Sequence, residues 1–455
     1  MQLRSFCRIW QRTAVRRTVA LVVGGSVLFV LIAGTERALR GSSEFPGFRE
    51  IVQVSIVHDR DQYEAIPHIR AYPPFFAIAW APFGLLPWGH LPDKNNVLGS
   101  STPGQAAALG VQAAALLTLM AAMTFWSARC VAAACGREHG WLSCLPVLTW
   151  LMAGLLMLNS VVRCETDLLV VMLVSGAMVL LFARRQPWLG GVLLGAAASL
   201  KVTPGLFAVY LLCRRRWQAL CGMMVAGLVC SVLLPVAVWG VDGAYARYAS
   251  WTEQVLLPVA TQGPDAIIDR PHRATNQSLW AASVRYLTPR SAGSSRHPHY
   301  VNFARVPMRI VRRAVTLLKL GVLSALLAAW LAVPPRCSRE PSVALFALVP
   351  VGMLLLSDVS IGGHLAILVV PLGFLCSFCF ERDGTAAGRR MSWAVLAALA
   401  LVLTLANDRL KEFSVPLLGV LALFALMLYV IARLQRQADS GPVQRLRRPL
   451  QRSPS

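Results

Sequence analysis

Long apolar runs of about 17–24 residues alternate with short polar clusters along most of this chain. A run of this length crosses the hydrocarbon core of a bilayer as a helix, because the backbone there must satisfy its own hydrogen bonds. The sequence lacks the short alternating segments that are typical of a membrane β-barrel. The pattern predicts an all-α polytopic membrane protein with about ten spanning helices, at 18–34, 106–128, 141–160, 166–183, 217–240, 310–333, 341–357, 364–380, 391–406 and 415–432.

Two further apolar stretches do not fit a simple span. The stretch 188–213 contains Lys201 and Pro204 near its middle. Proline breaks a helix, and a lysine at mid-depth costs about 2.5–3.5 kcal/mol on insertion scales. We therefore predict a re-entrant helical hairpin that turns at these residues. The stretch 74–90 is short and contains Pro82, so we expect an interfacial helix on the outer surface.

The basic residues predict the orientation of the spans. Lysine and arginine in short loops mark the cytoplasmic side, and the tails 1–17 and 433–455 are both arginine-rich with at most one acid. We therefore place both termini in the cytoplasm of a cell-membrane protein, around a transmembrane domain at 18–432. The last tail is expected to be disordered. The long outer loops, at about 35–105 and 241–305, put the chemistry on the extracytoplasmic face.

Composition supports a membrane protein and argues against a nucleic-acid partner. Hydrophobic residues make up 56% and charged residues 14%, whereas a soluble domain carries about 25% charge. The mean hydropathy is +0.57. A net charge of +23 in a soluble protein would suggest nucleic acid, but these cations stand at helix ends and no basic-aromatic module is present. Membrane lipids are the expected surroundings.

The outer loops carry the candidate chemistry. Glu44 follows the first predicted helix and is placed to act as a general base at the membrane surface; a solvated loop acid is the alternative. Asp59 and Asp61 have the spacing of a nucleotide-sugar metal site, but we interpret them as solvated acids and expect no metal.

Three other polar groups allow two interpretations each. The polar turn 159–167 is either a salt-bridged connection or the polar rim of a cavity. The arginines at 305–313 contact either a lipid-linked phosphate or ordinary headgroups. His364 enters a span from the outside and is either a structural hydrogen-bonding residue or a functional one.

Several motifs together carry a resemblance. They are Tyr72-Pro73-Pro74-Phe75-Phe76, the glycine-rich stretch that ends in Lys201-Val202-Thr203-Pro204, Asn276-Gln277-Ser278-Leu279 with Arg285, and Ser357 with His364. In this order they resemble glycosyltransferase family 87, the polyprenyl-phosphate-mannose-dependent type, over about residues 20–400. The resemblance implies the GT-C membrane fold. Glu44 stands where the family usually has an aspartate, so this chain resembles a divergent member.

The resemblance also implies an activity. It is the inverting transfer of a hexose, mannose above all, from a polyprenyl-phosphate sugar to an extracytoplasmic glycan or glycolipid acceptor, without a cofactor. Glu44 would be the base. The competing hypotheses are a transporter or lipid flippase, whose folds usually show paired broken helices, and an inactive membrane scaffold. The residues expected to bind the donor phosphate or sugar are Tyr72, Arg163, Lys201, Arg270, Arg273, Asn276, Gln277, Arg285 and His364.

Overall fold

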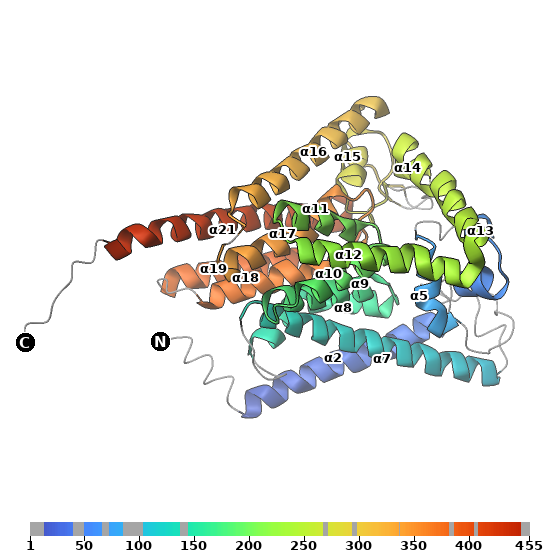
Figure 1. The fold of residues 1–455 in the computed structure, drawn as a ribbon, viewed down its shortest axis with the longest axis horizontal. Coiled ribbons are helices and arrows are strands. Elements are labelled where there is room, and N and C mark those ends of the chain that lie inside the picture. Colours follow the sequence, from blue (N-terminus) through green and yellow to red (C-terminus); the bar gives the residue numbers. More distant parts are fainter. Residues whose placement is uncertain are drawn as a thin grey trace, which may run out of the picture.

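The protein is an elongated bundle of helices, most of which run in roughly the same direction (Figure 1). Every regular element within the described residues is helical, which confirms the predicted all-α membrane fold. The computed structural model describes residues 13–39, 50–65, 72–84, 103–136, 144–266, 272–293, 298–335, 337–381, 386–404 and 408–446.

Each of the ten predicted spans contains helix. Among the described residues, six helices are long and apolar enough to cross a membrane by length and composition, and α8 is a seventh if its two bent halves form one span. The figure of ten spans therefore stays a prediction. The helices that cover the predicted spans are α2 (Thr13–Leu39), α7 (Pro103–Ala134), α8 (Cys144–Val162), α9 (Asp167–Phe182), α12 (Trp217–Leu228) with η4 (Val229–Leu233) and α13 (Leu234–Trp251), α16 (Met308–Ala332), α17 (Arg339–Leu356), η7 (Gly362–Leu368) with α18 (Val369–Glu381), α19 (Ala386–Thr404) and α21 (Val415–Leu446).

The predicted hairpin at 188–213 is present. Helix α10 (Pro187–Leu200) stops at Lys201, whose backbone is extended, and the chain turns back through η3 (Thr203–Gly205) into α11 (Leu206–Cys213). The guanidinium of Arg216, after α11, lies 4.9 Å from the ring centre of Phe182, shortly before α10 begins. Both arms of the hairpin therefore start and finish at the same end of the bundle.

Helix α10 packs very closely against α12. An added Cβ at Gly191 would lie 1.9 Å from the carbonyl oxygen of Ala219, and one at Gly195 would lie 2.3 Å from that of Met223. Only glycine allows two backbones to approach this closely, as is common where helices pack within a membrane. This contact fixes the position of Lys201, which follows directly on α10.

The two ends of the bundle differ in character. At one end, Arg214 donates hydrogen bonds to the carbonyls of Trp330, Val333 and Pro334, and Arg339 donates to those of Ala133 and Ala134. The start of α2 and the end of α21 also lie at this end (Figure 1). By the positive-inside tendency this is the cytoplasmic end of our proposed topology.

The opposite end carries the outer segments. Helix α5 (Phe75–Gly84) lies there and packs on α10, as expected for the stretch 74–90 as far as Gly84; the rest of that stretch is outside the described residues. Residues 50–65 dock on α13, where Trp239 and Arg247 both donate to the carbonyl of Ser55. Asp59, which we interpreted as a solvated acid, pairs with Arg247 at 2.7 Å while staying largely exposed.

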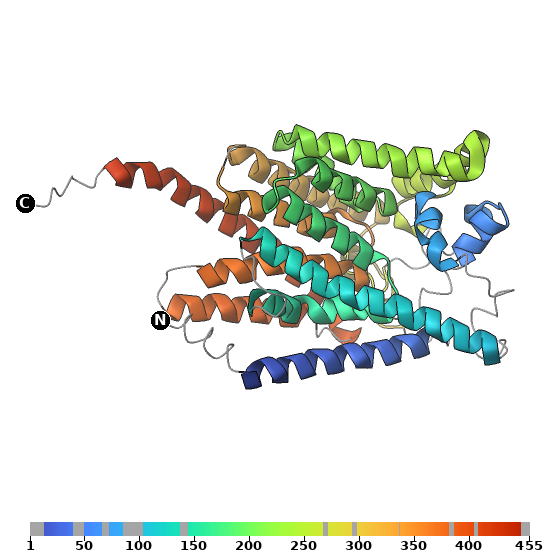
Figure 2. The same ribbon diagram turned by 60° about the horizontal axis from the view of Figure 1, so that its bottom comes forward.

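Two boundaries differ from the prediction. The outer loop predicted from 241 begins with helix, because α13 continues to Trp251, followed by η5 (Thr252–Leu256) and α14 (Leu257–Gln262). Gly240, with φ 71° and ψ 175°, bends the chain there without a steric penalty. The tail predicted to be disordered from 433 is instead helical up to Leu446. Residues 433–440 contain no glycine or proline, and the helix continues through Gly441 and Pro442. Figure 2 shows α2 (blue) and the α12–α13 helix (light green) on opposite sides of the bundle.

Candidate active site

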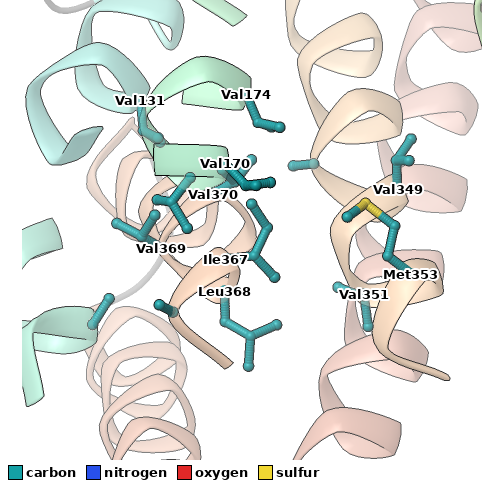
Figure 3. Close-up of a cluster of buried hydrophobic side chains, with 14 of the residues drawn as sticks. Val131, Val170, Val174, Val349, Val351, Met353, Ile367, Leu368, Val369 and Val370 are labelled. Atoms are coloured by element: carbon teal, nitrogen blue, oxygen red, sulfur yellow. The ribbon is translucent and has the colours of Figure 1, made fainter. Parts of the chain in front are cut away.

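A small recess with charged and apolar walls lies toward the end of the bundle opposite the start of α2 and the end of α21, where α9, α10, α17 and η7 meet. Asp167, Lys201 and His364 supply its charged and titratable groups, and Thr203 and Ser357 add hydroxyls. Its apolar wall includes Val170, Met353 and Ile367, which Figure 3 shows on three different helical segments. The recess therefore joins residues that are almost 200 positions apart in the sequence.

Lys201 and Asp167 form the central ion pair. The Nζ of Lys201 donates to Oδ1 of Asp167 at 2.6 Å, and both side chains are mostly buried, with exposed fractions of 17% and 11%. Asp167 is the first residue of α9, where a carboxylate is favoured by the helix dipole. Lys201 caps the end of α10 from an extended conformation. Breaking α10 at this residue is what turns the amine into the recess.

His364 completes the cluster. Its Nδ1 lies 2.9 Å from the carbonyl oxygen of Val359, and its Nε2 lies 3.8 Å from Oδ2 of Asp167. If Nδ1 carries the proton for Val359, then Nε2 is an acceptor in neutral histidine and a donor in the imidazolium. The cluster can therefore present one permanent cation and one switchable donor to an anion.

The recess is nearly closed in this structure. Its volume is about 20 Å³, which is room for about one water molecule. A phosphate is larger than this space, and it must also compete with Asp167 for Lys201. Local movement of the surrounding loops is therefore required for a sugar phosphate to bind.

The polar turn before α9 satisfies both interpretations suggested by the sequence. Nε of Arg163 pairs with Oε1 of Glu165 at 3.0 Å, which makes the turn salt-bridged. Asp167 at its end lines the recess, which makes it a rim as well. An added Cβ at Gly363 would lie 1.3 Å from Oε2 of Glu165, so glycine is required there for the turn to approach η7.

A second group of predicted residues holds the loop between α17 and η7, residues 357–361. Oδ1 of Asn276 accepts from the backbone N–H of Ser360 at 2.8 Å, and its Nδ2 donates to the carbonyl of Asp358 at 3.0 Å. The N–H of Gln277 donates to the carbonyl of Ser360 at 2.7 Å, and its Nε2 donates to the carbonyl of Lys411 at 2.9 Å. Because this loop precedes His364, Asn276 and Gln277 position the recess from outside it.

Arg285 is an internal brace of the same region. It is fully buried on α15 (Leu279–Leu287) and donates to the carbonyls of His272, Arg273 and Asn276, and to Oγ of Ser414. Burial lowers the pKa of Arg285 to about 10, which leaves it charged at neutral pH. Binding of a phosphate by Arg285 would require these bonds to be exchanged, so we assign it a positioning role.

Replacing Arg285 tests this role. We expect Arg285→Met to lower the free energy of unfolding by about 3 kcal/mol, because several buried carbonyls lose their donor. The measurement is thermal unfolding of the purified protein in detergent. The control is Arg290→Met, whose partly exposed pair with Asp265 should contribute less than about 1 kcal/mol. Equal stability of the two variants would contradict the bracing role.

The remaining predicted residues lie apart from the recess or outside the described residues. Tyr72 stacks on Phe76 with ring centres 4.0 Å apart, and its carbonyl accepts from the hydroxyl of Tyr63. Arg273 is half-buried and braces Arg285 through its carbonyl. Glu44 and Arg270 lie outside the described residues.

Other groups considered from the sequence take no part in the recess. The arginines at 305, 309, 312 and 313 are exposed just before and along the start of α16, where they can reach either lipid headgroups or a lipid-linked phosphate. Within the described ranges, no group of three or more His, Cys, Asp or Glu side chains is arranged to hold a metal ion.

Asp167 was predicted only as part of a possible cavity rim and was not selected as a site residue. Its signal was present, since it is a carboxylate at the head of an apolar run that is charge-free as far as Arg184. A buried carboxylate there needs a cationic partner. Only the tertiary structure identifies Lys201 as that partner, since 34 positions separate the two residues.

The fold and the recess define the general class, a multi-pass helical membrane protein with a charged recess at one end of its bundle. The family model for glycosyltransferase family 87 matches residues 71–358. That range covers more than half of the chain and includes Asp167 and Lys201 of the recess. The protein therefore belongs to glycosyltransferase family 87, which confirms the resemblance seen in the sequence.

One curated relative and one solved structure were also found. The relative, from Mycolicibacterium smegmatis (strain ATCC 700084 / mc(2)155), is a polyprenol-phosphate-mannose-dependent alpha-(1-2)-phosphatidylinositol mannoside mannosyltransferase. It is 27% identical over 186 residues, which cover 40% of this chain and 38% of the relative. The match thus spans less than half of either protein.

The solved structure is ArnT from Cupriavidus metallidurans bound to undecaprenyl phosphate. It is 14% identical and covers 93% of this chain and 80% of its own, with a TM-score of 0.34. A likeness at that score carries no argument about this chain.

Proposed function

We propose that this protein transfers a hexose, mannose above all, from a polyprenyl-phosphate sugar to a glycan or glycolipid acceptor outside the cell membrane. The observation that carries the proposal is the convergence of Lys201 and His364 on one recess at the loop-bearing end. Family membership and the name of the mannosyltransferase relative support it. A GT-C arrangement of the bundle, with cytoplasmic termini, belongs to the same proposal.

The chemistry assigns opposite tasks to the two sides of the scissile bond. Glu44 takes the proton of the acceptor hydroxyl as that oxygen attacks the anomeric carbon. The bond from the anomeric carbon to the phosphate oxygen breaks, and its electron pair stays on the phosphate. Lys201 stabilises the charge that develops there, in a water-poor site where a fixed cation is most effective. Attack from the face opposite the leaving group inverts the anomeric configuration.

Asp167 sets the affinity of Lys201 for the incoming phosphate. In the closed recess Asp167 compensates the charge of the lysine, as a buried cation requires. When a phosphate takes the amine, the carboxylate needs a new donor, and Nε2 of His364 at 3.8 Å is already beside it. Once it is protonated, His364 can therefore donate its remaining N–H, at Nε2, to the carboxylate while Lys201 binds the phosphate.

The test is a transfer assay with purified full-length protein. Radiolabelled polyprenyl-phosphate mannose, polyprenyl-phosphate glucose and GDP-mannose are offered separately with synthetic lipid-linked mannosides as acceptors. We expect label to reach the acceptor from a polyprenyl phosphate sugar and not from the nucleotide sugar. The same protein in liposomes should not move labelled lipid between leaflets. Lipid movement without transfer would favour the flippase alternative.

A further inference from the structure

A second lysine–aspartate pair lies beside the recess, on the side of α16. The Nζ of Lys319 lies 2.6 Å from Oδ1 of Asp358, which is the distance found between Lys201 and Asp167. Neither Lys319 nor Asp358 lines the recess. The two neighbours of Asp358 do reach it, because Ser357 lines the recess and the carbonyl oxygen of Val359 contacts Nδ1 of His364. The two ion pairs are therefore connected through a single loop, residues 357–361.

Lys319 is the only charged residue between Arg313 and Arg336 in the sequence. A charge inside such an apolar run costs about 2.5–3.5 kcal/mol on insertion scales, and it marks a functional site by default. Its neighbours Leu317, Leu318 and Leu320 are exposed on the surface of α16, while the lysine side chain is only 19% exposed. The lysine thus turns away from the lipid-facing surface and toward the loop.

Hydrogen bonds to its backbone carbonyl hold Asp358 in place. Its carbonyl accepts from Nδ2 of Asn276 at 3.0 Å and from Oγ of Ser278 at 2.7 Å. Its carboxylate is 33% exposed, three times as much as that of Asp167. Water can therefore solvate the carboxylate if Lys319 moves away from it. The backbone hydrogen bonds keep the loop fixed when Lys319 exchanges the carboxylate for another anion.

Helix α16 contacts the rest of the bundle mainly near its two ends. Val311 and Val315 pack on Trp280 and Val284 at the outer end. Leu326 and Trp330 belong to the main core at the other end, where Leu326 closes on Gly352. Lys319 stands between these two contacts, about 17 Å along the helix from Met308. Lys319 therefore lies on a helix whose neighbouring leucines face outward from the bundle, whereas Lys201 lies at the end of α10 in the recess.

We propose that Lys319 is a binding residue for a lipid phosphate on the membrane side of the recess, with Asp358 as its exchangeable counterion. The inference rests on the proposed function, since it adds an entry position for the same donor. A phosphate oxygen replaces the carboxylate on Nζ, and Asp358 becomes solvated. The phosphate of an ordinary phospholipid has the same chemistry, so the test must separate the two sources.

The test measures binding of undecaprenyl phosphate to the purified full-length protein, by native mass spectrometry in detergent. We expect Lys319→Met to weaken binding roughly tenfold, because a charge-assisted contact is lost. Asp358→Asn should tighten binding by about fivefold, because the competing carboxylate is removed. Undecaprenol, which lacks the phosphate, should respond to neither substitution. The control is Arg184→Met, an exposed cation at the opposite end of the bundle, which should leave binding unchanged.

The opposite effects of the two single variants on binding distinguish a binding site from an ion pair that only stabilises the fold. If the ion pair only stabilises the fold, both single variants should weaken binding and the double variant Lys319→Met/Asp358→Asn should restore it. That result would overturn the inference. Equal displacement by phosphatidylglycerol would also overturn it, since the site would then serve headgroups. If only Lys201→Met weakens binding, the inference fails and the proposed function stands. If the unaltered protein does not bind undecaprenyl phosphate, the proposed function fails as well.

Discussion

Replacing Lys201 by methionine is expected to reduce sugar transfer by about 10²–10³-fold. The amine is the cation that the recess presents to the leaving phosphate, and methionine keeps much of the side-chain volume while removing the charge. Because Lys201 stabilises charge that grows in the transition state, kcat should fall as well as the affinity for the donor. The measurement is steady-state transfer from polyprenyl-phosphate mannose over a range of donor concentrations.

The control for folding uses the partner of Lys201. Lys201→Met leaves the Asp167 carboxylate buried without its lysine, and loss of one partner of a buried pair typically costs about 3–5 kcal/mol. The double variant Lys201→Met/Asp167→Asn removes both charges and should recover most of that stability. Its transfer rate should stay low. Recovery of transfer together with stability would show that the lysine acts only on the fold.

Replacing Glu44 by glutamine is expected to reduce kcat by about 10²–10⁴-fold, the usual contribution of a general base. Glutamine keeps the size and one acceptor oxygen but cannot take the proton of the acceptor hydroxyl. Binding of undecaprenyl phosphate should be unchanged, because in the proposed mechanism the base acts on the acceptor hydroxyl. The two readouts, transfer and phosphate binding, should therefore separate Glu44 from Lys201.

Two further variants serve as controls for Glu44. Glu44→Asp keeps the carboxylate and shortens it by one methylene, so it should retain more activity than Glu44→Gln. Glu64→Gln changes an exposed carboxylate in the same outer segment and should leave transfer unchanged. Full activity in Glu44→Gln would remove this residue from the mechanism and leave the base to be found elsewhere.

Much of the architecture was predictable because the bilayer imposes a simple rule on the sequence. Apolar runs of spanning length must be helical, and each predicted run contains helix in the structure. The hairpin at Lys201 and Pro204 was predictable for the same reason, since neither residue fits a continuous span. The missed helix after Gly240 has no such rule, because outer segments are not required to be helical or irregular.

The candidate site was predictable only in part. Lys201 and His364 were selected from the sequence, and the structure places them on one recess. Arg285 and Asn276 were selected as donor ligands, but their polar groups are taken up by backbone partners at the 357–361 loop and its surroundings. Sequence patterns identify polar residues that need a partner, and they do not identify which partner each residue finds.

The sequence by itself determined that this is a helical membrane protein, where its helices run, which end carries the arginines and which family it belongs to. The helices and the arginine-rich end follow from the local cost of placing polar groups in lipid, and the family follows from the order of the motifs. Only the tertiary structure decided that Asp167 pairs with Lys201 and Asp358 with Lys319. Ion pairs depend on contacts between distant segments. The close α10–α12 packing and the bracing of the 357–361 loop are what bring those segments together.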